Sequence, residues 1–228
     1  MVNYEKEIDK LLKKLYPITR SITGDGNRET LKIFQEIAPI KIREYLSGQE
    51  VYDWTVPKEW NIKNAWIKNS KGERVIDFKN SNLHIVSYSI PVNEKLRLID
   101  FKAHLFFLEN SPDAIPYRTS YYNETWGFCL SFNDYEKLFS DDNEEFEIFI
   151  DSSLENGSLS IGELIIEGKG KKEYLLSSYI CHPSMLNDSM SGAIAATFIA
   201  KELLEKQQQL EHSYRIIFVP ETIGAIAY

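Results

Sequence analysis

Three polar side chains at the ends of two predicted strands could act together in metal chemistry. His182 follows one predicted strand, Asp188 lies six positions later in the loop that leads into a helix, and Glu221 follows the next strand. The two parallel strands of a β-α-β unit end at the same edge of their sheet, and ligands bind just outside those carboxyl ends. An imidazole and two carboxylates at one edge suit a divalent zinc site, in which one carboxylate can act as the base that activates a water.

Each of these residues also has an ordinary structural interpretation. A histidine after a strand can be a surface residue, Asp188 can cap the helix that follows it, and Glu221 can be a solvated loop charge. Cys181 and His182 could instead form a nucleophilic pair, but adjacent residues of a strand point to opposite faces of the sheet. We therefore expect Cys181, like Cys129, to be a buried small hydrophobic residue. The convergence of three residues on one edge favours the metal site.

The elements around these residues follow the pattern of an α/β sheet with a parallel core. The predicted elements are strands over 160–168, 173–180 and 214–219 and a helix over 189–207, which form a hairpin followed by a β-α-β unit. Asp188 and Ser189 are candidates for the cap of that helix. Two amphipathic helices, over 4–16 and 27–37, come first in the chain.

The segment 49–150 has a different character. It is dominated by aromatic and β-branched residues and has little helical periodicity. We therefore predict an α/β domain made of residues 1–48 and 151–228, interrupted by a smaller, mostly β module over 49–150. Its candidate strands are 50–55, 64–68, 75–78, 84–88, 127–131 and 146–150, with a short helix over 133–139 that Asn133 would cap.

One part of this module could contribute to substrate binding. The stretch IPYRTSYYNETWGFC, residues 115–129, concentrates aromatic side chains and one arginine in a turn-rich segment. Arg118 could clamp a substrate carboxylate, with Tyr121, Tyr122 and Trp126 beside it. Alternatively, the aromatic residues form the core of the module and Arg118 pairs with an acidic residue.

The composition argues against several classes of function. The 228 residues carry a formal net charge of -8 and no basic cluster, so we expect no nucleic-acid partner. The start of the chain does not resemble a signal peptide, and no apolar run is long enough to span a bilayer. Two cysteines do not make a disulfide framework. We therefore expect a cytoplasmic protein with no membrane partner.

Longer segments of the sequence resemble a known group of enzymes. SSYICHPSMLNDSMSGAIAATFIAKELL, followed by YRIIFVPETIGAIAY, resembles the core of zinc aminopeptidases of the leucyl aminopeptidase type, peptidase clan MH. In these enzymes a strand ends in a histidine ligand, an Asn-Asp-x-x-Ser-Gly stretch opens a helix, and a further strand ends in Glu-Glu-x-Gly. The segments LYPITRSITGDG, NLHIVSYSIPV and IPYRTSYYNETWGFCLSF are also similar to those of an aminopeptidase-like bacterial family of poorly defined function with an inserted β module.

The resemblance implies a role for individual residues. His182 matches the first metal ligand, Asp188 the carboxylate that bridges two metals, Glu221 the general base and Gly224 the motif glycine. The sequence departs from the pattern in two places. Thr222 stands where the peptidases have a second glutamate, and the usual His-x-Asp is replaced by His-Pro-Ser at 182–184.

Together these features predict an α/β fold of the phosphorylase/hydrolase-like, zinc-peptidase type, with a mixed sheet, a parallel core and flanking helices. The chain ends on an apolar run, so we expect it to be truncated at its C-terminus, with the remaining ligands of one or two zinc ions beyond Tyr228. Residues 1–228 alone would then be inactive.

The expected function is that of a zinc-dependent aminopeptidase-like hydrolase. It would cleave peptide or amide bonds of small-molecule substrates through a metal-activated water. The alternative, to which Thr222 points, is a catalytically inactive aminopeptidase-like binding protein linked to surface polysaccharide biosynthesis. A homo-oligomer is compatible with either function.

Overall fold

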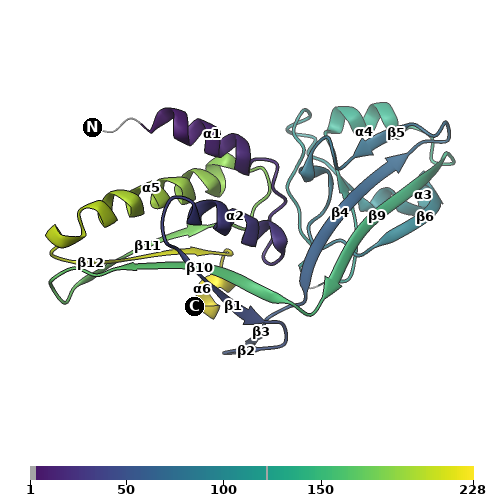
Figure 1. Cartoon of the computed structure of the whole chain (residues 1–228). Coiled ribbons are helices and arrows are strands. Elements are labelled where there is room, and N and C mark those ends of the chain that lie inside the picture. Colours follow the sequence, from purple (N-terminus) through teal and green to yellow (C-terminus); the bar gives the residue numbers. More distant parts are fainter. Residues whose placement is uncertain (1–3, 122) are drawn as a thin grey trace. The chain divides into compact units, whose positions relative to one another are not determined.

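The computed structural model describes residues 4–121 and 123–228 (Figure 1). Contacts within the chain divide it into two compact units. Unit 1 consists of Met1–Glu59 and Asn156–Tyr228, and unit 2 of Trp60–Glu155. Strand β1 (Lys41–Leu46) pairs with β10 (Ser158–Ile166), and both strands belong to unit 1.

Unit 1 contains a four-stranded mixed sheet in the order β1-β10-β12-β11. The pairs β1/β10 and β10/β12 (Ser213–Val219) are antiparallel, whereas β11 (Glu173–Tyr179) and β12 are parallel. Helix α5 (Ser191–Glu205) makes the crossover between β11 and β12. The predicted α/β class, with a parallel strand pair and flanking helices, is confirmed.

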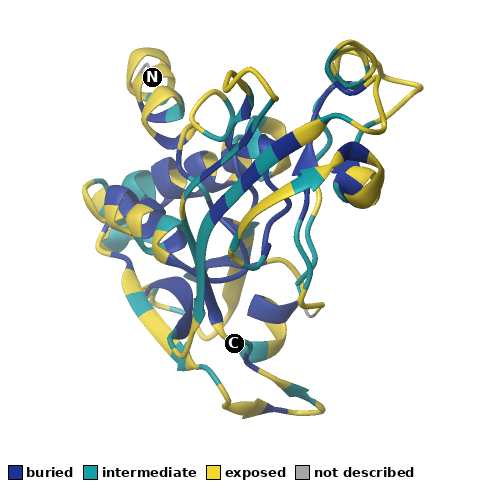
Figure 2. Cartoon of the chain, turned by 90° about the vertical axis from the view of Figure 1, so that its right-hand side faces the viewer, coloured by how far each residue is buried: buried dark blue, intermediate teal, exposed yellow. Residues whose placement is uncertain are grey.

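Three helices cover one face of this sheet: α1 (Glu5–Leu15), α2 (Asp25–Gln35) and α5 (Figure 1). In α1 the buried Leu11 and Leu15 alternate with exposed charged residues, as in an amphipathic helix (Figure 2). In α5, Ala193, Ala196 and Ala200 are buried, and their small side chains allow the helix to approach the sheet closely. The three helices and the sheet share one hydrophobic core.

A buried carboxylate links the strands of this sheet. The Glu163 side chain is only 3% exposed and accepts hydrogen bonds from Arg43 on β1, from Arg215 on β12 and from the hydroxyl of Tyr228. Burial raises the pKa of Glu163, but the hydrogen bond from Tyr228, followed by the interaction with Arg43, outweighs it, and the net direction is down. The ionised carboxylate therefore stabilises the fold.

We expect Glu163→Gln to lower the free energy of unfolding by about 2 kcal/mol at neutral pH, since the amide keeps the shape but loses the charge. The folded-state pKa lies below the unfolded one, so this stabilisation is present above the unfolded pKa and is lost as the pH falls through the folded pKa. The difference from wild type should therefore be constant from about pH 6 to 8 and shrink below about pH 4. Urea unfolding at a series of pH values measures it, with the exposed Glu167→Gln as control. A difference that does not vary with pH would contradict the electrostatic explanation.

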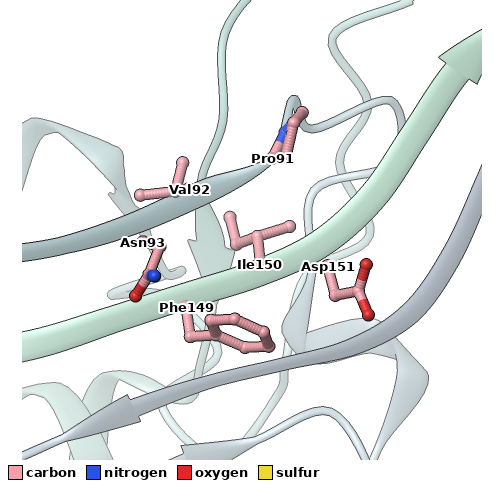
Figure 3. A pocket seen from close by; sticks show the side chains of 6 residues that line it. All are labelled: Pro91, Val92, Asn93, Phe149, Ile150 and Asp151. Carbon is pink, nitrogen blue, oxygen red and sulfur yellow. The ribbon is translucent and has the colours of Figure 1, made fainter.

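Unit 2 is built around a second four-stranded sheet, in the order β5-β4-β9-β6. Its strands are β4 (Glu59–Lys68), β5 (Arg74–Asp77), β6 (Val92–Arg97) and β9 (Glu145–Glu155). Short elements complete it: α3 (Leu98–Phe101), β7 (Leu105–Phe106), β8 (Phe128–Cys129) and α4 (Phe132–Leu138). The rings of Phe101, Phe139 and Phe146 contact one another in its core. A hollow of about 320 Å³ lies over β6 and β9, lined by Pro91, Val92, Asn93, Phe149, Ile150 and Asp151 (Figure 3).

The structure corrects several predicted elements. Residues 84–88 do not form a continuous strand. His84 ends the 3-10 turn Asn82–His84, which the Ser81 hydroxyl caps, and Ile85 and Ser87 make isolated β-bridges. Residues 50–55 form two short strands, β2 (Glu50–Val51) and β3 (Trp54–Thr55), that pair as a hairpin. Helix α4 is capped by Ser131 rather than Asn133.

β1 and β6 are the two longest of the described strands that were not predicted. Both lie at the edges of their sheets and carry mainly exposed, charged residues, so they lack the alternating apolar pattern of a half-buried strand. Within residues 4–121 and 123–228, no helix combines the length and the apolar character needed to cross a membrane.

Candidate metal centre

The parallel strands β11 and β12 bring the predicted site residues together. Tyr179, the last residue of β11, is the register partner of Val219, the last residue of β12. The pairing continues past both strands, because the amide of Ile180 donates to the carbonyl of Val219. The segments that carry His182 and Glu221 therefore leave the sheet side by side.

His182 lies between the two acidic residues predicted to share its site. Its Nε2 is 3.3 Å from Oε2 of Glu221, and its Nδ1 is 3.5 Å from Oδ1 of Asp188. The His182 side chain is 6% exposed, whereas those of Glu221 and Asp188 are 47% and 63% exposed. One ion can bind only one of the two ring nitrogens, so the carboxylate at the other nitrogen is placed to orient the ring.

The prediction that Asp188 caps the helix that follows it is wrong. Helix α5 starts at Ser191, its N-cap position is Met190, and no side chain caps it. Asp188 has an extended backbone, with φ -115° and ψ 95°, in the turn before the helix. The hydroxyl of Ser189, the other predicted cap, donates to the carbonyl of Tyr179 at 2.6 Å. Neither residue caps the helix, and the Asp188 carboxylate faces His182 instead.

The turn after β12 fixes the position of Glu221. The amide of Gly224 donates to the carbonyl of Pro220 at 3.0 Å, which folds the short helix α6 (Ile223–Ala227) back against the strand end. A Cβ at Gly224 would lie 2.6 Å from Cδ of Pro220 and 2.8 Å from Cβ of Val219, so only glycine fits there. This close approach explains why a glycine is needed at position 224, the motif glycine of the sequence.

Arg20 hydrogen-bonds the backbone of the site, a role that was not predicted from the sequence. Its side chain is fully buried, and its Nε donates to the carbonyl of His182 at 2.9 Å while Nη1 donates to the carbonyl of Leu15 at 2.8 Å. Burial lowers the pKa of the guanidinium to about 10. The loop between α1 and α2 thus holds the backbone of His182, a residue 162 positions away in the sequence.

Replacing Arg20 with methionine keeps much of the buried stem but removes the donors of two carbonyls. Each buried carbonyl left without a donor costs about 1–3 kcal/mol, so we expect the free energy of unfolding to fall by at least roughly 2 kcal/mol. Urea unfolding measures the loss. Arg97→Met, at an exposed arginine that pairs with Asp100, is the matched control. An Arg20 variant no less stable than that control would show that the guanidinium does not support the site.

Cys181 lies in the same cluster, contrary to the expectation that it points away from His182. The ligand atoms of Cys181, His182 and Glu221 are all within 4.8 Å of one another. The expectation assumed that the strand continues to residue 181, but β11 ends at Tyr179, and strand alternation no longer applies beyond it. Burial raises the pKa of the Cys181 thiol to about 11. In the metal-free site it is therefore protonated at neutral pH, which argues against a cysteine nucleophile.

A polar hollow of about 370 Å³ lies in unit 1, between the end of β11 and the start of α5. It is lined by Ser177, Ser178, Tyr179, Asn187, Ser189, Ser191 and Gly192. Asn187 and Ser189 flank Asp188 in the sequence, so the hollow adjoins the segment that carries this carboxylate. Its hydroxyl and amide groups could hydrogen-bond a polar ligand.

The predicted substrate residues of the aromatic segment belong to unit 2. The Arg118 guanidinium lies over the ring of Phe106 at 4.4 Å, and Trp126 stacks on His104 with ring centroids 4.0 Å apart. Tyr121 contacts the ring of Tyr88 edge-on. Tyr122 lies outside the described residues. These contacts fit the alternative in which the aromatic residues pack within the module.

Comparisons with known proteins place this arrangement in a family. Residues 9–228 match the family model described as "Domain of unknown function (DUF4910)". Over 222 residues the chain is 51% identical to a protein of Clostridium acetobutylicum named as a polysaccharide biosynthesis protein with aminopeptidase-like domain, a match that covers 97% of this chain and 50% of that protein.

Solved structures give the same picture of the fold. A crystal structure from Clostridium acetobutylicum, named as a peptidase, is 50% identical with a TM-score of 0.91, and the match covers 97% of this chain and 51% of that one. A zinc aminopeptidase from Bacillus subtilis is 11% identical with a TM-score of 0.57, over 95% of this chain and 60% of that one, and shows the fold alone. The chain spans about half the length of the Clostridium relatives that it matches.

Proposed function

Because the chain belongs to the family described as a domain of unknown function (DUF4910) and has an aminopeptidase-like fold, we propose that it is part of a zinc-dependent hydrolase of aminopeptidase type. One observation carries the proposal. A nearly buried imidazole, at the shared end of two parallel strands, has a carboxylate within 3.5 Å of each ring nitrogen. Ligands bind at this edge in open α/β sheets.

The residues present fit a zinc ion. Zinc accepts imidazole nitrogen, carboxylate oxygen and thiolate sulfur, and all three kinds of ligand atom occur in the cluster. Ligand atoms bound at about 2.0–2.3 Å in a tetrahedral site lie roughly 3.3–3.8 Å apart. The separation of 3.5 Å between Nδ1 of His182 and Oδ1 of Asp188 is within this range. His182 and Asp188 are the residues that would hold the ion.

The chain's own residues have distinct roles in this proposal. The chemistry that zinc supplies when bound is polarisation of the substrate carbonyl and acidification of a water. Glu221, half exposed beside the ring, accepts the proton of that water and returns it to the leaving amine. Arg20 holds the His182 backbone, so the imidazole keeps its place at the end of the strand.

The proposed substrates are small molecules with a peptide or amide bond. The polar hollow next to Asp188 is the proposed place for the substrate, because its serine, tyrosine and asparagine side chains offer both donors and acceptors.

A second candidate function rests on the two departures from the peptidase pattern. Thr222 and Ser184 stand where the peptidases have a glutamate and an aspartate, and the curated relative is named for polysaccharide biosynthesis. A chain with too few ligands would be a catalytically inactive binding protein with a link to surface polysaccharide biosynthesis.

Elemental analysis of the full-length protein as purified, together with a screen of aminoacyl amides, separates the two functions. The hydrolase is expected to contain at least one zinc ion per chain and to lose turnover on chelation and regain it with zinc. A protein that contains no metal, and that hydrolyses no amide after zinc is added, would favour the binding protein.

A further inference from the structure

Cys181 is placed where a ligand of the proposed ion is missing from the sequence. The peptidases have a second glutamate directly after the general base, and this chain has Thr222 there. The thiol of Cys181 lies against the same turn, because the amide of Glu221 donates to its sulfur at 3.1 Å. A sulfur atom at this turn could take the place of the absent carboxylate.

The surroundings of the sulfur are those of a ligand cluster. Its Sγ lies within 4.8 Å of a ring nitrogen of His182 and of a carboxylate oxygen of Glu221. Ligand atoms around tetrahedral zinc lie roughly 3.3–3.8 Å apart, so small side-chain rotations bring the thiol into range. The Cys181 side chain is fully buried, and the exposed side of the cluster is formed by the carboxylate.

We propose that the thiolate of Cys181 is a ligand of the same ion that His182 holds. This inference rests on the proposed function, because it needs an ion at His182. On binding, the sulfur–hydrogen bond breaks, the sulfur binds the metal, and the proton leaves to solvent, with no change of oxidation state. A thiolate beside an imidazole favours zinc and cobalt over magnesium or manganese, which prefer all-oxygen sites. The family's carboxylate-rich ligand set would thus contain a softer ligand in this chain.

Cobalt(II) is the probe for this ligand, because a thiolate bound to cobalt gives a near-ultraviolet charge-transfer band that oxygen and nitrogen ligands do not give. We expect the band when the metal-free, full-length protein is titrated with cobalt. The Cys181→Ser protein should lack this charge-transfer band. It should still bind cobalt, which the weaker d–d absorption bands of the bound ion in the visible range would show. Cys129→Ser, at the other buried cysteine, is the matched control and should keep the charge-transfer band.

The outcomes separate this proposal from the proposed function. Visible bands without the charge-transfer band in the wild type would overturn the ligand role of Cys181 but leave the metal site intact. A wild type that binds no cobalt at all would overturn the metal site itself.

A measurement on the unaltered protein does not depend on the folding of any variant. X-ray absorption of the zinc-loaded wild type should show a sulfur shell at about 2.3 Å. A shell of nitrogen and oxygen alone would overturn the proposal.

Discussion

Glu221→Gln is expected to slow amide hydrolysis by the full-length protein about 10²- to 10⁴-fold, the usual contribution of a positioned proton acceptor. The amide keeps the shape of the side chain but cannot take a proton from water. Zinc affinity should stay nearly unchanged, because a general base does not need to be a ligand. The expectation follows from the position of Glu221, half exposed at 3.3 Å from the ring of His182.

Steady-state kinetics and a zinc titration on the same preparations test this prediction. Glu167→Gln, at an exposed glutamate just beyond β10, is the control and should keep full activity. If the Glu221 variant instead binds zinc weakly and regains activity with excess zinc, Glu221 is a ligand that stands in for the one missing at Thr222. If neither binding nor turnover changes, Glu221 is a loop charge and the binding-protein function becomes the better account.

The proximity of these three residues could be predicted because it depends on a general rule of topology. His182, Asp188 and Glu221 each follow or connect strands of one β-α-β unit, and parallel strands end at the same edge. The observed pairing of β11 with β12 and the crossover by α5 have the predicted form. The predicted relationship to aminopeptidase-like bacterial proteins is also confirmed, by a match over 97% of the chain.

The support of the site could not be predicted, because it depends on contacts between distant parts of the chain. Arg20 lies in a loop rich in threonine, serine and glycine, and nothing in its neighbourhood links it to a carbonyl 162 residues later. A lone arginine in such a polar loop is usually a surface charge, and only the folded chain shows that this one is fully buried.

The position of Cys181 shows how one strand boundary changes a conclusion. Strand alternation predicts opposite faces for residues 181 and 182, and this holds only while the strand continues. The strand ends at Tyr179, and strand ends cannot be located to within two residues from sequence. The charged edge strand β1 was missed for a related reason, since its pairing with β10 is not visible in its own pattern.

His182→Ala has the second large expected effect, on metal binding. The ring is the group on which both carboxylates of the cluster converge, and its removal takes away the one imidazole ligand. Loss of even an outer partner of a metal ligand costs about 10- to 100-fold in affinity, so we expect zinc to bind the variant more than ~100-fold more weakly. The fold should persist, because the ring lies at the end of the strand and is not among the residues of the hydrophobic core cluster.

The central claim is that an ion binds at the shared end of β11 and β12, and a calorimetric zinc titration tests it most directly. Metal-free, full-length wild type is compared with His182→Ala and with His212→Ala, a histidine of the same unit that contacts the ring of Tyr174. We predict tight binding by the wild type and by His212→Ala, and a loss of more than ~100-fold for His182→Ala. Equal zinc affinity in all three proteins would contradict the claim.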